Sequence, residues 1–238
     1  MINVKNNKKS LADKIVDNVD YNSPVIVNYI VVCFILYFAN IITNGYINDI
    51  CYLPGNLIVN PFALHRLLTY TLVHGSFEHL IGNMALLALT GPSVENKYGG
   101  GIVLGLLGVN SVMIGLLQGV LIHQGVMGAS SIVFMILILS VFADTETKKI
   151  PITVFIVGAC YIGNELIGAL MTDSVSQLSH IMGAVLGIVF GVLYSRVSDA
   201  EKEKQEISEE FAEGKRAVQK YFSNYLTALK SIGSRNTK

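Results

Sequence analysis

The sequence predicts an all-α membrane protein, a bundle of six transmembrane helices with both termini in the cytoplasm. Hydrophobic residues make up 52% of the 238 residues and charged residues only 14%, against roughly 25% charged residues in an ordinary soluble domain. Most of the charged residues lie in residues 1–22 and 198–238, so long stretches of the middle carry almost no charge. An apolar centre between polar ends is typical of a membrane domain.

Six apolar segments are candidates for the spans, since a helix needs about 20 mostly apolar residues to cross a bilayer. They are residues 24–43, 77–94, 100–122, 129–143, 150–170 and 178–195. The first segment is almost uniformly apolar, and the third is rich in glycine. The second and fourth segments are short and polar at one end, which makes them the weakest candidates. The predicted organisation is an N-terminal cytoplasmic segment (1–22), a six-helix core (23–196) and a cytoplasmic tail (197–238) that is itself helical.

The orientation follows from the basic residues, because cytoplasmic loops of membrane proteins are enriched in Lys and Arg. With six spans, one side of the membrane receives Lys5, Lys8, Lys9, Lys14, Lys97, Lys148, Lys149 and Arg196. The other side receives only Arg66. The count of six and the charge bias therefore support each other, and both termini are expected in the cytoplasm.

The loops and the tail carry two further expectations. The outer connection 44–76 is long and contains Pro54, Pro61 and several apolar residues, which favours a structured loop that dips partly into the membrane interface. In the tail, mixed charges are followed by spaced aromatic residues and leucines, which favours a solvated helix. Weak docking on the membrane surface is the alternative, through Tyr221, Phe222, Tyr225 and Leu229.

Several classes of site and partner receive no support. Cys33, Cys51 and Cys160 lie far apart with no CxxC, so free thiols are expected. The net charge of zero gives no indication of nucleic-acid binding. No HExxH motif occurs, and His74 and His79 would lie on different sides of a helix, so we expect neither a metal site nor a cofactor. Residues 1–22 lack the apolar stretch of a signal peptide.

Polar side chains converge near the outer ends of three predicted spans. His74, His79 and Asn83 lie before and in the second span, Ser130 begins the fourth, and His180 lies near the start of the sixth. At 1.5 Å per residue they share a depth on the order of 10 Å below the outer surface. Polar groups at this depth are costly, so their convergence indicates a functional site.

The residue types match the needs of nucleophilic catalysis. A serine hydroxyl such as that of Ser130 is a weak nucleophile until a base takes its proton, and the imidazole of His180 can do so near neutral pH. Acyl transfer also needs donors for the developing oxyanion. His79 and Asn83, at i and i+4 on one helix face, and the backbone N–H of Ser130 are the candidate donors.

Glycines at Gly183, Gly187 and Gly191 repeat every four residues on the helix that carries His180. Small residues at this spacing let helix backbones approach closely in lipid. Ordinary helix packing explains the spacing equally well. Because His180 shares the glycine face, we expect Gly183 and Gly187 to bring it to Ser130.

At this point the sequence resembles the rhomboid intramembrane serine proteases. The matching stretches, in order, are HGSFEHLIGN (74–83), GPSVENKYG (91–99), GASS (128–131) and HIMGAVLG (180–187). The resemblance spans about residues 24 to 195 and implies a six-helix bundle of rhomboid type. It implies Ser130 as nucleophile, His180 as base, and His79 and Asn83 on the oxyanion side. Arg66 in the first loop, and Glu95 and Gly99 as an ExxxG pair, also match.

Three residues depart from the family pattern. Ser131 stands where glycine is commoner, which raises the question of how closely the backbone packs there. Phe134 replaces a tyrosine whose ring packs on the catalytic histidine, so the packing is kept and the hydroxyl lost. His65 precedes Arg66 where an aromatic such as tryptophan is usual.

Three other residues have open or minor roles. His74 is either an accessory polar contact or part of the loop packing. His123 is expected to be an interfacial loop histidine. Glu165 either orients His180 as a third catalytic member or, as we prefer, is a gate-facing or interfacial carboxylate.

The resemblance implies a Ser–His dyad that cuts substrate membrane proteins, single-pass or multi-pass, near the extracytoplasmic end of a transmembrane helix. The expected location is a plasma membrane, with a bacterial origin favoured, and the lipid bilayer is the other partner. A catalytically silent rhomboid-like protein that retains client helices is the first alternative. A channel or transporter is the second, and only Asn110, Ser111 and Gln118 in the third span favour it.

Overall fold

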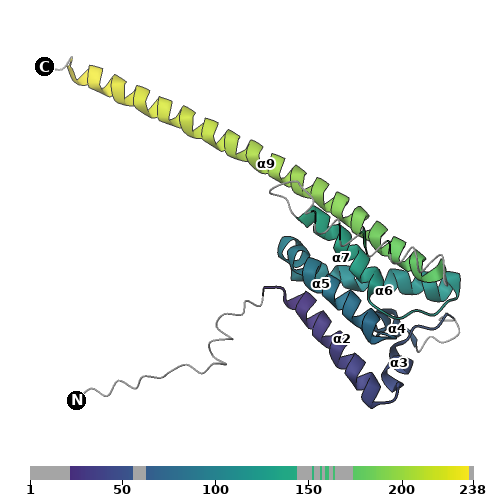
Figure 1. Ribbon diagram of the computed structural model, residues 1–238. Helices are drawn as coiled ribbons and strands as arrows, with labels where there is room; N and C mark the ends of the chain where they lie inside the picture. Colours follow the sequence, from purple (N-terminus) through teal and green to yellow (C-terminus); the bar gives the residue numbers. More distant parts are fainter. Residues whose placement is uncertain are drawn as a thin grey trace, which may run out of the picture. The chain divides into compact units, whose positions relative to one another are not determined.

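The computed structural model describes residues 22–55, 63–143 and 174–235, together with positions 152, 156, 159, 160 and 163. These residues are helical apart from loops and one isolated bridge. The elements are α2 (Pro24–Ile42), α3 (Tyr46–Cys51), α4 (Arg66–Thr69), η3 (Tyr70–Leu72), α5 (Phe77–Tyr98), α6 (Gly100–Leu116), the π-helical segment η4 (Leu117–Ile122), α7 (Ser130–Ala143) and α9 (Ser174–Arg235) (Figure 1). The contacts divide the chain into two compact units, one through Phe190 and one from Gly191 onward.

Five of the six expected spans fall on described helices. Three helical stretches are long and apolar enough to cross a membrane, namely Pro24–Ile42, Gly100–Ile122 and Leu178–Tyr221, and α7 is a shorter apolar helix. The second expected span lies in α5, which continues to Tyr98. The fifth, 150–170, lies outside the described residues except for single positions. The count of six, the domain limits and the cytoplasmic termini stay predictions.

The described part of the expected outer loop is structured. It contains α3, α4 and η3, and its side chains Leu53, Leu67 and Tyr70 form a buried cluster with Ile114 of α6. Leu53 also pairs through its backbone with Val126, in the loop that precedes α7. These contacts hold the loop against the helices that carry the polar layer.

Glu95 joins α5 to the beginning of α2. Its buried carboxylate accepts hydrogen bonds from the backbone N–H groups of Val25 (3.0 Å) and Ile26 (2.9 Å). The first N–H groups of a helix have no acceptor within the helix, and a negative charge is favourable at that end. Gly91, one turn before Glu95, admits the Ile26 side chain, because a Cβ there would lie 2.6 Å from it. Glu95 is therefore a side-chain cap supplied by a neighbouring helix.

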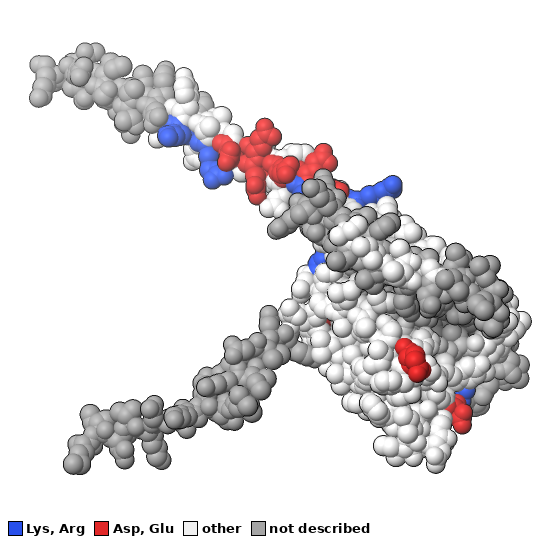
Figure 2. All heavy atoms as spheres, in the orientation of Figure 1, with Lys and Arg blue, Asp and Glu red and all other residues white. Residues whose placement is uncertain are grey.

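The outer faces of α2 and α6 carry large exposed hydrophobic side chains, among them Ile35, Phe38, Ile42 and Leu104. Figure 2 shows few charged side chains on the visible face of the unit that contains these helices. A water-facing surface would need more polar groups, whereas acyl chains cover such a face without cost. This surface fits a protein embedded in a bilayer.

Replacing Glu95 tests its capping role. Glu95→Ala is expected to lower the free energy of unfolding by about 2–3 kcal/mol, because two backbone donors lose a charged acceptor. Reversible unfolding in mixed micelles measures the change. The matched control is Glu206→Ala, at an exposed position of α9, for which a change within about 0.5 kcal/mol is expected. Equal effects of the two substitutions would contradict the capping role.

Candidate active site

Ser130 and His180 meet in the interior of the helical unit. The Oγ atom of Ser130, the first residue of α7, lies 2.7 Å from Nε2 of His180 in the second turn of α9. Both side chains are buried. The distance is that of a good hydrogen bond, so the hydroxyl proton can pass to the imidazole without any movement of the helices.

The turn before Ser130 is held by the loop and by α5. Gly128 has φ +110°, a conformation that residues with a side chain rarely adopt, and a Cβ there would lie 2.8 Å from the His79 ring. The N–H of Gly128 donates to the carbonyl of Tyr70 at 2.9 Å. These contacts fix the direction in which the chain enters α7, and with it the Ser130 side chain.

His74 makes the accessory polar contact. Its Nε2 atom accepts a hydrogen bond from the Ala129 N–H at 3.4 Å, and its ring lies edge-on to the His79 ring with the centroids 5.3 Å apart. Burial, with a smaller contribution from His79, lowers the pKa of His74 to about 3. His74 is therefore neutral at physiological pH, as an acceptor role at Nε2 requires. It supports the turn that presents Ser130.

The His180 ring is held by an aromatic neighbour and by glycines. Phe134 stacks on it with the centroids 4.8 Å apart and the planes 19° from parallel. A Cβ at Gly183 would lie 2.2 Å from the Ser131 carbonyl oxygen, and one at Gly187 would lie 2.7 Å from that of Met135. The glycine face expected from the sequence thus lies directly against α7.

His79 and Asn83 lie on the adjacent helix. Asn83 is fully buried and His79 is partly exposed, one turn earlier on α5. Ser76 caps this helix, since its side chain accepts from the His79 N–H at 3.2 Å. Of the described helices, α5 and α7 form the most extensive pair, and the His79 ring lies beside Gly128, two residues before α7 begins. The N–H of Ser130, in the first turn of α7, has no acceptor within its own helix.

A family model described as the Rhomboid domain matches residues 61–197, more than half of the chain. The chain belongs to the rhomboid family. No curated protein sequence matches it. Rhomboids are helical membrane proteins, most of them intramembrane serine proteases and some without activity, and the resemblance read from the four motifs is confirmed.

This rhomboid uses Ser131 in a way that the sequence did not indicate. The Ser131 hydroxyl donates to Oδ1 of Asn110 on α6 at 2.8 Å, and the Asn110 amide donates back to the Ser131 carbonyl at 3.4 Å. The side chain therefore points to α6, and the backbone of Ser131 stays in contact with Gly183. Replacement of the usual glycine has not pushed α9 away from α7.

A second polar pair lies beside His180. The Gln118 amide in η4 donates to the hydroxyl of Ser179, and both residues are buried. Ser111, the other polar residue of the third span, donates to the carbonyl of Leu107 at 2.7 Å. In the sequence, these side chains indicated only a channel. The partner of Gln118, Ser179, is a polar residue on another apolar helix, so a search for polar residues on pairs of apolar helices could have found it.

No contact with the dyad is found for the other candidates that the structure describes. His123 is exposed in the loop between η4 and α7 and has φ +58°. Arg66 donates to the carbonyl of Tyr52 at 3.0 Å, and so ties α4 to the end of α3. Cys33 and Cys51 are buried free thiols and Cys160 is an exposed one. Glu165 lies outside the described residues, so its role stays a prediction.

The pair between Ser131 and Asn110 generates a stability prediction. Ser131→Ala is expected to cost about 1–2 kcal/mol of unfolding free energy, because the Asn110 oxygen loses its donor inside the bundle. The matched control is Ser140→Ala on the same helix, where the hydroxyl donates only to the Leu137 carbonyl of its own helix at 2.7 Å. Unfolding in mixed micelles measures both, and an equal loss for the two would contradict an interhelical role.

Proposed function

We propose that this rhomboid is an intramembrane serine endopeptidase that works through a dyad of Ser130 and His180. The observation that carries the proposal is the 2.7 Å contact between Ser130 Oγ and His180 Nε2 inside the bundle. A nucleophile and a base at hydrogen-bond distance are the minimum requirement for acyl transfer. The stacking of Phe134 on His180 holds the imidazole in the orientation that the contact needs.

The reaction proceeds in two balanced halves. In the first, Ser130 Oγ attacks the scissile carbonyl carbon while His180 takes the hydroxyl proton, and the tetrahedral intermediate collapses as His180 gives that proton to the leaving amine. In the second, His180 takes a proton from a water that attacks the acyl-enzyme, and returns it to Ser130 Oγ. The products are a free carboxylate and a free amine, and no metal or cofactor takes part.

The developing oxyanion requires hydrogen-bond donors that are in place before the reaction. The N–H of Ser130 supplies one, because it lies in the first turn of α7. The side chains of His79 and Asn83 on α5 supply two more. Gly128 belongs to the same arrangement, since its lack of a Cβ leaves the His79 ring its place beside the turn.

The substrates are membrane proteins, single-pass or multi-pass, cut near the extracytoplasmic end of a transmembrane helix. A helix hides its carbonyl groups in its own hydrogen bonds, so the substrate must unwind locally before Ser130 can reach a carbonyl. Helix-breaking residues near the cut should therefore favour cleavage. The proposed topology has six spans and cytoplasmic termini, in the plasma membrane of a bacterium.

A catalytically silent protein that retains client helices is the competing function. It would need neither a nucleophile nor a base, whereas this chain keeps Ser130 and His180 in contact. A channel is less well supported, because Asn110 and Gln118 are buried and hydrogen-bonded to neighbouring helices. The protease is therefore the function that the site favours.

A fluorophosphonate probe tests the nucleophile directly. Purified protein in detergent is expected to be labelled covalently, Ser130→Ala to lose all labelling, and His180→Ala to react about 10²–10⁴-fold more slowly. Ser140→Ala, a serine of the same helix outside the site, is the matched control and should keep the parent rate. Labelling of Ser130→Ala at the parent rate would remove Ser130 as the nucleophile.

Replacing the oxyanion donors tests the second part of the site. Asn83→Ala is expected to reduce kcat for a transmembrane substrate by about 10²-fold or more with little change in KM, because its contact forms with the transition state. His79→Ala should act in the same direction. Single-turnover cleavage in proteoliposomes measures the two constants. A rise in KM at constant kcat would instead assign Asn83 to substrate binding.

A further inference from the structure

The part of α9 that follows Gly191 carries an apolar stripe that the proteolytic site does not use. Exposed side chains along it are Ile207 (61%), Phe211 (77%), Val218 (58%) and Tyr221 (70%), and Gly214 lies between them in the same row. The successive spacings are four, three, four and three residues. A stripe of large apolar side chains with this exposure indicates an interaction surface.

The spacing is the heptad of a coiled coil, with a period of 3.5 residues. Ile207, Gly214 and Tyr221 take the d positions, and Phe211 and Val218 take the a positions. The register extends backward to Lys204 at a and Ala200 at d, which gives three consecutive heptads. In a two-stranded coiled coil, each a or d side chain inserts into a socket of four residues on the facing helix.

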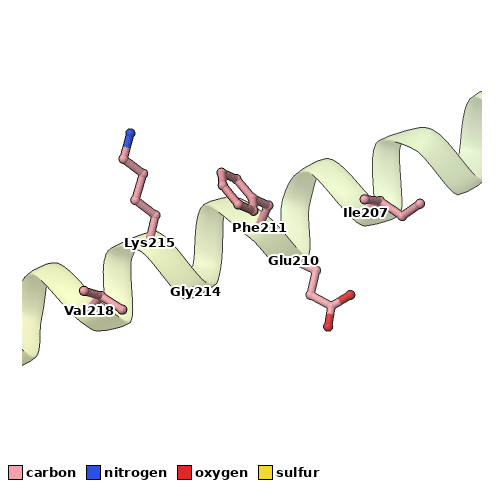
Figure 3. A pocket seen from close by; sticks show the side chains of 6 residues that line it. All are labelled: Ile207, Glu210, Phe211, Gly214, Lys215 and Val218. Atoms are coloured by element: carbon pink, nitrogen blue, oxygen red, sulfur yellow. The ribbon is translucent and has the colours of Figure 1, made fainter.

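The surface of α9 is hollowed along this stripe. A depression of about 690 Å³ is lined by Ile207, Glu210, Phe211, Gly214, Lys215 and Val218 (Figure 3). These six residues are the members of two successive sockets. One socket consists of residues 207, 210, 211 and 214 and receives an a side chain, and the other consists of residues 211, 214, 215 and 218 and receives a d side chain. Gly214, with no side chain, leaves room for an aromatic residue such as Phe211 of a facing helix.

Charged side chains flank the depression in a complementary arrangement. Glu210 takes a g position and Lys215 takes the following e position, and Figure 3 shows them pointing to opposite sides of the apolar row. In a parallel pair, a g residue faces the e residue of the next heptad on the partner, so Glu210 of each copy meets Lys215 of the other. In an antiparallel pair, like charges would face each other instead.

We propose that this surface of α9, Ala200–Tyr221, binds the same surface of a second copy of the chain as a parallel two-stranded coiled coil. Two rhomboids in one membrane share one orientation, so in the proposed topology both C-terminal tails begin on the same side of the membrane. Lys204 at an a position and Gly214 at a d position make the pair weak. Confinement to the membrane raises the effective concentration of the copies and so favours the pair.

Docking on a lipid surface fits the same stripe less well. Residues 199–216 contain seven Asp or Glu residues and four Lys or Arg residues, and Figure 2 shows the acidic side chains gathered along this part of α9. The cytoplasmic leaflet is negatively charged and attracts basic segments. The excess of acidic residues beside the stripe therefore opposes binding to an anionic membrane surface. In a dimer, Glu210 of one copy and Lys215 of the other would instead form ion pairs.

Cysteine crosslinking of the full-length protein in proteoliposomes tests whether the a and d positions of two copies face each other. Val218→Cys places a thiol at an a position, where two copies in a parallel pair come close enough for a disulfide. Ala212→Cys, at an exposed b position of the same helix, is the matched control. We expect oxidation to convert Val218→Cys to disulfide-linked dimer. Ala212→Cys should give no more dimer than the parent chain. Equal crosslinking at both positions, or none at either, would overturn the proposal.

A charge exchange tests the partner and its direction. In the Val218→Cys protein, Glu210→Lys or Lys215→Glu alone should reduce the crosslinked dimer, because each places like charges across the seam. The double exchange Glu210→Lys with Lys215→Glu should restore it. A double exchange that gives no more dimer than the single ones would overturn the parallel pair.

An environment-sensitive fluorophore attached to the thiol of Val218→Cys distinguishes pairing of two copies from docking of the stripe on lipid. Its emission should be the same in vesicles of neutral lipid and of phosphatidylglycerol. A blue shift that grows with the phosphatidylglycerol fraction, together with absence of crosslinked dimer, would assign the stripe to the membrane surface and overturn the proposal. Ser130→Ala should crosslink like its parent, so failure of the proteolytic assignment and failure of the dimer are distinguished.

Discussion

The close contact between α7 and α9 is the constraint on which the candidate site depends. At Gly183 the backbone of α9 lies so near the Ser131 carbonyl that even a methyl group would overlap it. The hydrogen bond between Ser130 and His180, at 2.7 Å, tolerates only a few tenths of an ångström of separation before it weakens. The distance between the serine hydroxyl and the imidazole is thus set by the packing of two helices, which the absence of a side chain at Gly183 permits.

Contacts with residues outside α9 also hold the start of α7 in place. His74 accepts a hydrogen bond from the Ala129 N–H, the His79 ring occupies the space beside Gly128, and Asn110 of α6 accepts a hydrogen bond from Ser131. A bilayer offers no water to polar groups that lose their partners, and here the Ala129 N–H and the Ser131 hydroxyl each have a protein acceptor. The same hydrogen bonds that satisfy buried polar groups therefore orient Ser130, and stability and site geometry have a common origin.

The sequence was sufficient for the features that repeat along one helix or match a family motif. Ser130, His180 and the row of Gly183 and Gly187 were predicted because their spacing places them at known heights and on known faces. Apart from Ser130 and His180, the polar pairs between helices were not predicted, because periodicity within a helix does not determine its register against a neighbour. The bond of Ser131 to Asn110, that of Gln118 to Ser179 and the capping of α2 by Glu95 all depend on such registers. For Glu95 the motif gave the position but not the partner.

The two halves of α9 show how the surroundings change the rules of helix packing. Before Phe190, small residues every four positions allow backbone contact, which is the means of association in lipid, where apolar side chains gain nothing from leaving the solvent. After Gly191, large apolar side chains follow a period of 3.5 between charged residues, which is the means of association in water, where their burial supplies the free energy. The boundary between the two compact units, at Phe190 and Gly191, falls at the end of the glycine row and before the heptads begin at Ala200. A continuous helix can therefore follow the packing rules of lipid around His180 and those of water along the proposed pairing surface, without either constraining the sequence of the other.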